Sequence, residues 1–229
     1  MVTKKKTSIK SDRVPRGQCI AIIGDIIASR RLGSQRSAAQ RKLFKVLKEL
    51  NSKYKTVILS KFIVTAGDEF QVLLKKADLI PDLIWDMETN LNYDVRLGIG
   101  CGRINTPLQP SAIGMDGPVW HAARAAIKES YMKKKYGGVF KQFGNEDDLI
   151  LNGFARILQL HRAGITSKQL RILHLLRDGS SQAEVADRLR ITRQAASQHA
   201  RLAGWSSYEE AERGWKTALE NYDFTKQWQ

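Results

Sequence analysis

The chain has 229 residues, 42% of them hydrophobic, and it carries a formal net charge of +15. This length predicts one large domain or two unequal ones, and the hydrophobic fraction excludes a disordered chain. No apolar run approaches the roughly 20 residues of a membrane helix, and the basic N-terminus has no apolar signal core. We therefore expect a cytoplasmic protein without a membrane partner, in which Cys19 and Cys101 are buried free thiols.

The basic residues are concentrated toward the N-terminus. Residues 1–55 contain 15 Lys and Arg against 3 Asp and Glu, whereas residues 56–164 contain 13 against 12 and residues 165–229 contain 10 against 8. We expect residues 1–16 to form a flexible basic arm. The charge suits a polyanionic partner, either nucleic acid or a nucleotide, and the alternative is a solvated basic surface that binds nothing.

Hydrophobic periodicity from residue 17 to 144 predicts an α/β (α+β) domain with the split βαββαβ order. Apolar strands alternate with amphipathic helices, and a tight turn joins two of the strands. The predicted elements are, in chain order, strand 18–24 ending at Asp25, helix 34–54 capped by Ser34, strand 56–65, strand 68–74, helix 77–90 and strand 94–101. A helix over 118–135 and a short hairpin over 136–143 are expected to follow.

The last third of the chain is predicted to be entirely helical. Residues 145–164 read as a connecting helix, and residues 165–229 as a separate helical domain. Hydroxyl residues at the expected helix starts can cap the helices, and Ser181 with Glu184 forms a capping-box pattern. The helices expected in this domain cover 167–177, capped by Thr166, then 182–189, 193–202, capped by Thr192, and 207–220.

Topology brings two aspartates together in the N-terminal domain. In a βαββαβ sheet the first and third strands are antiparallel neighbours, so Asp25 at the end of one should meet Asp68 at the start of the other. Two close carboxylates repel each other unless a cation lies between them, and their hard oxygens suit Mg²⁺ or Mn²⁺. The alternative is that each aspartate simply caps a turn.

The same residues carry a family resemblance. The segments AIIGDIIASR, VTAGDEF, VRLGIGCG and GMDGPVWHAARAA follow the order found in class III nucleotidyl cyclases, and AGDEF resembles the turn of GGDEF diguanylate cyclases. More narrowly, GDIIASR, VTAGDEFQ and GMDGP are similar to the SatD-like family of bacterial proteins. The resemblance covers about residues 18–135 and implies a ferredoxin-like, palm-type domain whose Asp25, Asp68 and Ile26 carbonyl hold Mg²⁺ or Mn²⁺.

The resemblance also implies a nucleotide ligand. The loop after Asp25 would wrap its phosphates, with Arg30 and Arg31 adding charge, and His121 would contact phosphate or base. Arg124 matches the arginine that supports the transition state in cyclases, so it would be the catalytic residue of an active enzyme. The alternative for His121 is a helix histidine with no chemical role. Cyclase-like domains pair head to tail, which implies a homodimer.

Three positions depart from the cyclase pattern. Trp120 replaces the asparagine before the catalytic arginine, Val64 replaces the base-reading lysine, and Ile113 replaces the acidic base-reading residue. The metal positions therefore remain while the substrate-handling positions are lost. We expect metal-dependent nucleotide binding without purine cyclisation.

The C-terminal stretch QAEVADRLRITRQAASQHARLAG resembles helix-turn-helices of the sigma-factor and LuxR type. Ala186 is small enough for two helices to cross, and Arg190 stands where a turn glycine is usual. Outward residues at the start of the second helix could pair with DNA bases and phosphates. These candidate DNA-binding residues are Thr192, Arg193, Gln194, Ser197 and Gln198. A plain helical bundle, or one that binds protein, is the alternative.

These patterns together predict a transcriptional regulator. Its cyclase-like domain would bind a nucleotide or cyclic nucleotide with Mg²⁺ or Mn²⁺, and its helix-turn-helix would bind double-stranded DNA as a homodimer. The alternative is an active nucleotidyl cyclase or phosphoryl transferase regulated by the helical domain.

Overall fold

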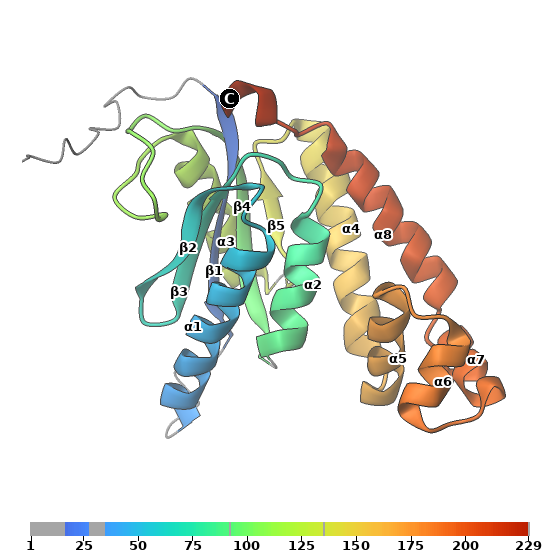
Figure 1. The fold of residues 1–229 in the computed structure, drawn as a ribbon. Coiled ribbons are helices and arrows are strands. Elements are labelled where there is room, and N and C mark those ends of the chain that lie inside the picture. Colours follow the sequence, from blue (N-terminus) through green and yellow to red (C-terminus); the bar gives the residue numbers. More distant parts are fainter. Residues whose placement is uncertain (1–16, 28–34, 92, 135, 229) are drawn as a thin grey trace, which may run out of the picture.

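The computed structural model describes residues 17–27, 35–91, 93–134 and 136–228 (Figure 1). Its centre is a mixed five-stranded sheet in the order β2-β3-β1-β4-β5, and only β4 and β5 are parallel. The first four strands and the two helices between them follow the predicted βαββαβ order, which is confirmed. The strands are β1 (Gln18–Ile26), β2 (Ile58–Ala66), β3 (Glu69–Leu74), β4 (Val95–Arg103) and β5 (Val139–Lys141).

Helices cover both faces of this sheet. Alternate residues of β1 point to opposite sides, so each face of the strand packs against its own helices. Ile20 and Ile22 pack into the cluster formed with α1 (Arg36–Lys53) and α2 (Ile80–Leu91). Ala21 and Ile23 pack instead against α3 (Pro118–Lys133) on the other face. The central strand is therefore buried on both sides, as its uninterrupted apolar sequence predicts. Cys19 and Cys101 are buried and free, as expected.

Two glycines of β4 let α3 lie unusually close to the sheet. A Cβ at Gly98 would lie 2.3 Å from both the Ala123 carbonyl oxygen and the Ile127 nitrogen, and one at Gly100 would lie 2.4 Å from the Ala123 nitrogen. No side chain fits at such distances, so the alternating glycines of this strand serve close helix packing. This fixes the height of α3, and hence of its exposed arginine, above the sheet.

The structure differs from the sequence prediction over residues 136–143, and it does not describe the predicted cap of α1. The hairpin expected over 136–143 is wrong: the segment supplies one strand, β5, which pairs in parallel with β4. Its consecutive glycines, Gly137 and Gly138, resemble a hairpin turn but lead the chain into the edge of the sheet with positive φ angles. Helix α1 begins at Arg36 after Gln35, which makes no side-chain capping bond, and the predicted cap Ser34 lies outside the described residues.

The C-terminal helices follow the predicted boundaries closely. Each N-cap hydroxyl expected from the sequence accepts a backbone N–H: Thr166 from Gln169, Ser181 from Glu184 and Thr192 from Ala195. The helices are α4 (Asn145–Gly164), α5 (Ser167–Arg177), α6 (Gln182–Leu189), α7 (Arg193–Leu202) and α8 (Trp205–Glu220), followed by a 3-10 helix (Thr225–Trp228).

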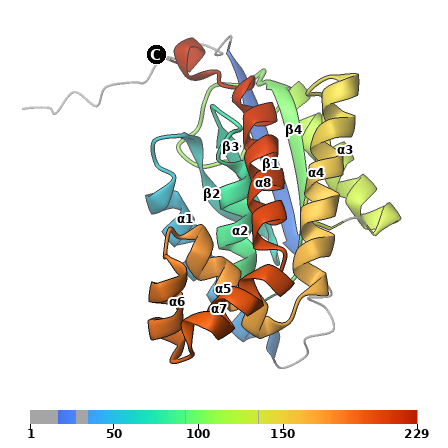
Figure 2. The same cartoon turned by 90° about the vertical axis from the view of Figure 1, so that its right-hand side faces the viewer.

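Helices α4 and α8 run side by side along the flank of the sheet (Figure 2). Their buried residues, among them Leu158, Tyr208 and Trp215, join the same hydrophobic cluster as Ile20 and Trp85. Helices α5, α6 and α7 pack around a second, smaller cluster, which includes Val185 and Ala186. Among the described helices, none is both long and apolar enough to cross a membrane.

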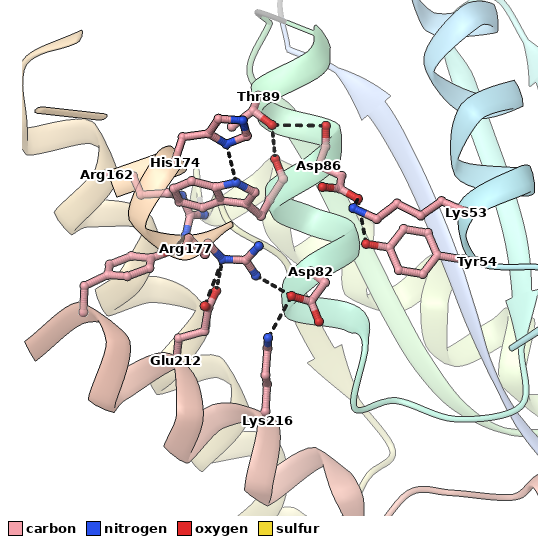
Figure 3. Close-up of polar contacts among 12 residues, drawn as sticks. Lys53, Tyr54, Asp82, Asp86, Thr89, Arg162, His174, Arg177, Glu212 and Lys216 are labelled. Atoms are coloured by element: carbon pink, nitrogen blue, oxygen red, sulfur yellow. Dashed lines mark hydrogen bonds and ion pairs between the residues drawn. The ribbon is translucent and has the colours of Figure 1, made fainter. Parts of the chain in front are cut away.

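A polar junction joins α2 to α5 and α8 (Figure 3). Arg177 donates to both oxygens of Glu212, at 3.0 and 2.9 Å, and to Asp82 at 2.6 Å. Its guanidinium also lies 4.8 Å from the ring centroid of Trp85, whose indole N–H donates to His174 Nδ1 at 3.0 Å. Because Arg177 is largely buried with its partners, these contacts tie α5 to α2 at a fixed position.

Candidate functional site

The ends of β1 and β3 place the two predicted aspartates side by side. Gly24 pairs with Phe70 in the antiparallel ladder, so Asp25 ends one strand where Asp68 introduces the other. Asp68 Oδ2 accepts a hydrogen bond from the backbone N–H of Ile26 at 3.0 Å. The three residues predicted to hold metal, Asp25, Ile26 and Asp68, are therefore brought together.

Arg96 completes this cluster, and the sequence reasoning missed it. It lies directly opposite Asp25 in the β1–β4 ladder and donates from Nη1 to Asp25 Oδ1 at 3.0 Å. Its guanidinium carbon lies 4.8 Å from the ring centroid of Tyr131 on α3. Strand order predicts that the first and fourth strands are neighbours, but only their register, seen in the structure, makes Asp25 and Arg96 a cross-strand pair.

The carboxyl of Asp25 lies in an unfavourable place for a charge. Burial raises its pKa above the ordinary value, the Arg96 guanidinium lowers it, and the neighbouring Asp68 and Glu69 carboxylates raise it again. The net direction is upward, so repulsion and lost hydration outweigh the single ion pair. A divalent cation at this position would relieve the repulsion.

Arg124 reaches the same end of the sheet from α3. Its Nη1 and Nη2 donate to the two carboxylate oxygens of Glu69, at 2.7 and 3.1 Å, in a bidentate pair. Thr65 Oγ1 donates to Glu69 Oε1 at 3.1 Å and so holds this carboxylate in place. Glu69 was not singled out from the sequence, although it belongs to the AGDEF turn. The predicted nucleotide-binding arginine is thus near the aspartates, with its charge engaged by Glu69.

Two of the described carboxylates, those of Asp25 and Asp68, could contribute oxygens to a metal site that a ligand completes. In the described part of the chain, no cluster of three or more His, Cys, Asp or Glu side chains is arranged to hold a metal ion. Asp25 and Asp68 each use one oxygen for Arg96 and Ile26 respectively, which leaves one oxygen of each for a cation. Mg²⁺ commonly takes only one or two protein carboxylates and fills its shell with water and phosphate oxygens. A phosphate-bearing ligand would therefore be needed to complete the site.

Of the remaining predicted nucleotide contacts, only His121 lies among the described residues, and it is not assembled with this cluster. Arg30 and Arg31 lie outside the described residues. His121 is exposed, 3.3 Å from Asp116, and lines a separate open pocket of about 600 Å³ together with Gln18. Gln18 is at the opposite end of β1 from Asp25, so the structure separates His121 from the aspartates.

The three positions that depart from the cyclase pattern have different environments. Trp120 is buried in the cluster under α3, where its indole N–H has no hydrogen-bond partner among the described residues. Val64 is half-buried and packs against the main hydrophobic core, while Ile113 is exposed. None of these side chains offers a charged or amide group for reading a purine base.

The predicted DNA-contacting residues form the outer face of α7. Thr192, Arg193, Gln194, Ser197 and Gln198 are all exposed. The opposite face is buried through Ala196 and Ala200, which pack with Val185 and Ala186 of α6. These small residues allow α6 and α7 to cross closely, as the sequence pattern predicts.

The turn between α6 and α7 depends on a strained residue. Arg190 has φ 52° and ψ 49°, a left-handed conformation, and its N–H bonds to the Ala186 and Asp187 carbonyls. This is the position where a turn glycine was expected. Arg190 therefore adopts the geometry of that glycine, at a conformational cost.

Comparisons with solved structures find similarity over a little more than half of the chain. A microbial GGDEF domain, described in its interaction with bis-(3′,5′)-cyclic di-GMP, is 15% identical with a TM-score of 0.40 and covers 55% of this chain and 78% of its own. A bacterial light-regulated adenylyl cyclase is 16% identical, with a TM-score of 0.39, over 54% of this chain and 75% of its own. A GGDEF domain from Pseudomonas aeruginosa is 14% identical, with a TM-score of 0.37, over 56% and 85%.

Sequence comparison is decisive at the level of the family. No curated protein is significantly similar in sequence to the chain. The model of the SatD family matches residues 19–205, which include the whole sheet and the helices through α7. This match extends well beyond the motifs that first indicated the resemblance. The chain belongs to the SatD family.

Proposed function

We propose that the protein is a DNA-binding transcriptional regulator that binds a nucleotide or cyclic nucleotide, together with Mg²⁺ or Mn²⁺, at the end of β1 and β3. The observation that carries the proposal is the outer face of α7, where all five polar residues predicted to meet DNA are exposed. The end of β1 that carries Asp25 lies toward the same end of the molecule as α5–α7 (Figures 1 and 2). A ligand bound beside Asp25 would therefore be at the end of the molecule that carries α5–α7, where it could change the position of these helices.

The chemistry of α7 suits direct reading of base pairs. Arg193 can pair bidentately with guanine, and Gln194 with adenine, in the major groove. Both residues lie in the first turn of α7, the part of a recognition helix that usually contacts base edges. Thr192 caps the helix and leaves its N-terminus toward solvent, where a backbone phosphate can bind.

Selection from random duplexes, followed by fluorescence anisotropy with the selected sequence, tests the DNA-binding half. We expect Arg193→Ala and Gln194→Ala each to weaken binding by about 1–3 kcal/mol and to relax the preference at one base pair. The matched control is Arg171→Ala, an exposed arginine on α5, which should bind almost as the wild type does. Failure to enrich any sequence, with no salt-sensitive binding to random duplex, would contradict the proposal.

The acidic pair at the sheet end supports the nucleotide-binding half. Asp25 and Asp68 would hold the metal with their second oxygens, and the metal would neutralise phosphate charge. Arg124 could turn from Glu69 to the phosphate, because its side chain is more than half exposed. Isothermal titration with nucleoside triphosphates and cyclic nucleotides in Mg²⁺ should give binding that Asp25→Asn and Asp68→Asn abolish. Asp116→Asn, an exposed aspartate elsewhere, is the matched control.

A second candidate function, phosphoryl transfer, is favoured by one observation. Arg124 lies at the same sheet end as the two aspartates, where it could stabilise charge that develops on a transferring phosphate. Incubation with each of the four ribonucleoside triphosphates and Mn²⁺ decides between sensing and catalysis. Release of pyrophosphate, lost in Arg124→Ala, would establish an enzyme, whereas intact triphosphates bound to the protein would support a sensor.

A further inference from the structure

The outer side of α4 carries an apolar stripe that nothing in the described part of the chain covers. Leu149 is 76% exposed, Ile150 48%, Ile157 61% and Leu160 50%. These four residues and Gly153 fall within about 100° of the helix circumference, given 100° per residue. Figure 2 shows α4 at the flank of the molecule, beside α8. Isolated exposed apolar residues are ordinary, but four on one helix face mark an interaction surface.

The same helix buries a different face in its own chain. Leu151, Ala155 and Leu158 are the buried residues of α4, and they join the cluster shared with the sheet and α8. They lie on the side of the helix opposite the exposed stripe. The exposed stripe therefore takes no part in the packing of α4 within its own chain.

The spacing of the stripe is that of a helix–helix seam. Ile150, Gly153, Ile157, Leu160 and Gly164 recur at intervals of three, four, three and four residues, which is the heptad pattern of a coiled coil. A Cβ added at Gly153 would meet no atom within 4 Å, so the middle of the stripe is an open notch. A bulky side chain from another helix could fill that notch.

We propose that this face of α4 binds α4 of a second copy of the chain, with the two helices antiparallel. With a two-fold axis that crosses the stripe at the level of residue 155, Ile157 of each copy enters the notch over Gly153 of the other, and Ile150 packs on Leu160. The large residues of the stripe thus meet the small one, which makes the surface complementary to itself. The interface does not require that the proposed function be correct, although it would unite two copies of α7 in one particle.

The charge at the start of the helix favours the antiparallel direction. Asp147, Asp148 and Arg162 are engaged within their own chain, by Tyr222, by backbone N–H groups and by Glu88 respectively. Glu146 is exposed and falls on the face of the stripe. In the antiparallel pair each Glu146 lies beside Gly164 of the partner helix and far from the other Glu146. A parallel pair would place like charges together, and it would align the two helix dipoles unfavourably.

Sedimentation equilibrium of the full chain tests the interface. We expect a dimer whose dissociation constant rises at least about tenfold in Ile157→Glu, since a charge would have to enter the seam. Phe44→Glu is the matched control, because Phe44 is also about half exposed but lies on α1, and it should leave the dimer unchanged. A wild-type chain that remains monomeric at all concentrations, or a dimer unaffected by Ile157→Glu, would overturn the proposal.

Cysteine cross-linking tests the direction and register. The double variant Gly153→Cys/Ile157→Cys should form a disulfide-linked dimer, because these positions face each other, while the native Cys19 and Cys101 are buried. Ile157→Cys alone should stay uncross-linked. Efficient cross-linking of the single variant would instead indicate a parallel pair and refute the antiparallel arrangement. Both experiments omit DNA and nucleotide, so they can fail while the proposed function holds, or succeed while it fails.

Discussion

Asp68 accepts a hydrogen bond from the backbone N–H of Ile26 at 3.0 Å, and this contact joins two strand ends that are 42 residues apart. The bond directs one carboxylate oxygen toward the residue that follows Asp25. The hydrogen bond holds Asp68, which precedes β3, beside Asp25 near the end of β1, so that two acidic groups lie at one place. The cost of that arrangement falls on Asp25, whose pKa is raised mainly by burial.

Replacing Asp25 by asparagine should stabilise the protein near neutral pH. Because the folded-state pKa of Asp25 is raised above its unfolded value, its contribution to stability is complete below about pH 4 and is lost as the pH rises through the folded-state pKa. Asp25→Asn removes this loss and keeps an acceptor for Arg96. Thermal unfolding should show a higher Tm than wild type near pH 7 and a much smaller difference near pH 3. A lower Tm at neutral pH would mean that the ion pair outweighs burial.

Removing the charge of Arg177 should be strongly destabilising. Its guanidinium is largely buried between Glu212 and Asp82, so Arg177→Met would leave Glu212 buried without its main partner. Breaking a buried pair in this way typically costs about 3–5 kcal/mol. Urea unfolding would measure the loss. The control is Lys133→Met. Lys133 is exposed, and its partner Glu129 keeps a second ion pair with Lys141, so the loss should be less than about 1 kcal/mol.

Glycine at position 190 should stabilise the turn between α6 and α7. Arg190 is held at φ 52°, and a left-handed conformation costs a residue with a Cβ about 1–2 kcal/mol. Arg190→Gly should therefore raise the free energy of unfolding by about 1 kcal/mol in urea titration. Arg188→Gly, inside α6, should lower it by about 1 kcal/mol. Equal losses in both variants would show that the Arg190 side chain stabilises the fold in another way.

Alanine at Gly98 should disrupt the packing of α3 on the sheet. The added methyl would lie 2.3 Å from backbone atoms of α3, which cannot move aside as a flexible side chain can. We expect a loss of about 3 kcal/mol, at the upper end of the usual cost of overpacking. Gly164→Ala, where the new atom meets nothing within 4 Å, should cause no loss of stability, because alanine favours a helix more than glycine does. Calorimetry of both variants would measure the difference.

Local signals predicted the helical part of the chain well. The caps Thr166, Ser181 and Thr192 mark helix starts because a hydroxyl there satisfies a backbone N–H that has no partner within the helix. The same reasoning failed over 136–143. Gly137 and Gly138 have the composition of a hairpin turn, and only the availability of β4 as a distant neighbour makes the segment a parallel edge strand.

Only the part of the candidate site that follows from strand order could be predicted from the sequence. Strand order alone places Asp25 beside Asp68. The pair Arg96–Asp25 depends on the register of β1 and β4, and the pair Arg124–Glu69 depends on the height of α3 above β4. Strand order alone fixes neither of these. His121 was grouped with the site through the family resemblance, yet it lines a pocket near the other end of the sheet.

The change that a nucleotide causes in the affinity of the protein for its selected duplex is the most direct measure of the proposed regulation. Anisotropy titrations would be run with each ribonucleoside triphosphate or cyclic nucleotide, in the presence of Mg²⁺. We predict that at least one ligand changes the dissociation constant for DNA by about fivefold or more, and that Asp68→Asn abolishes the change while retaining DNA binding. A duplex that binds with the same affinity in the presence and absence of every nucleotide would contradict the proposed regulation. The absence of any DNA binding would contradict it as well.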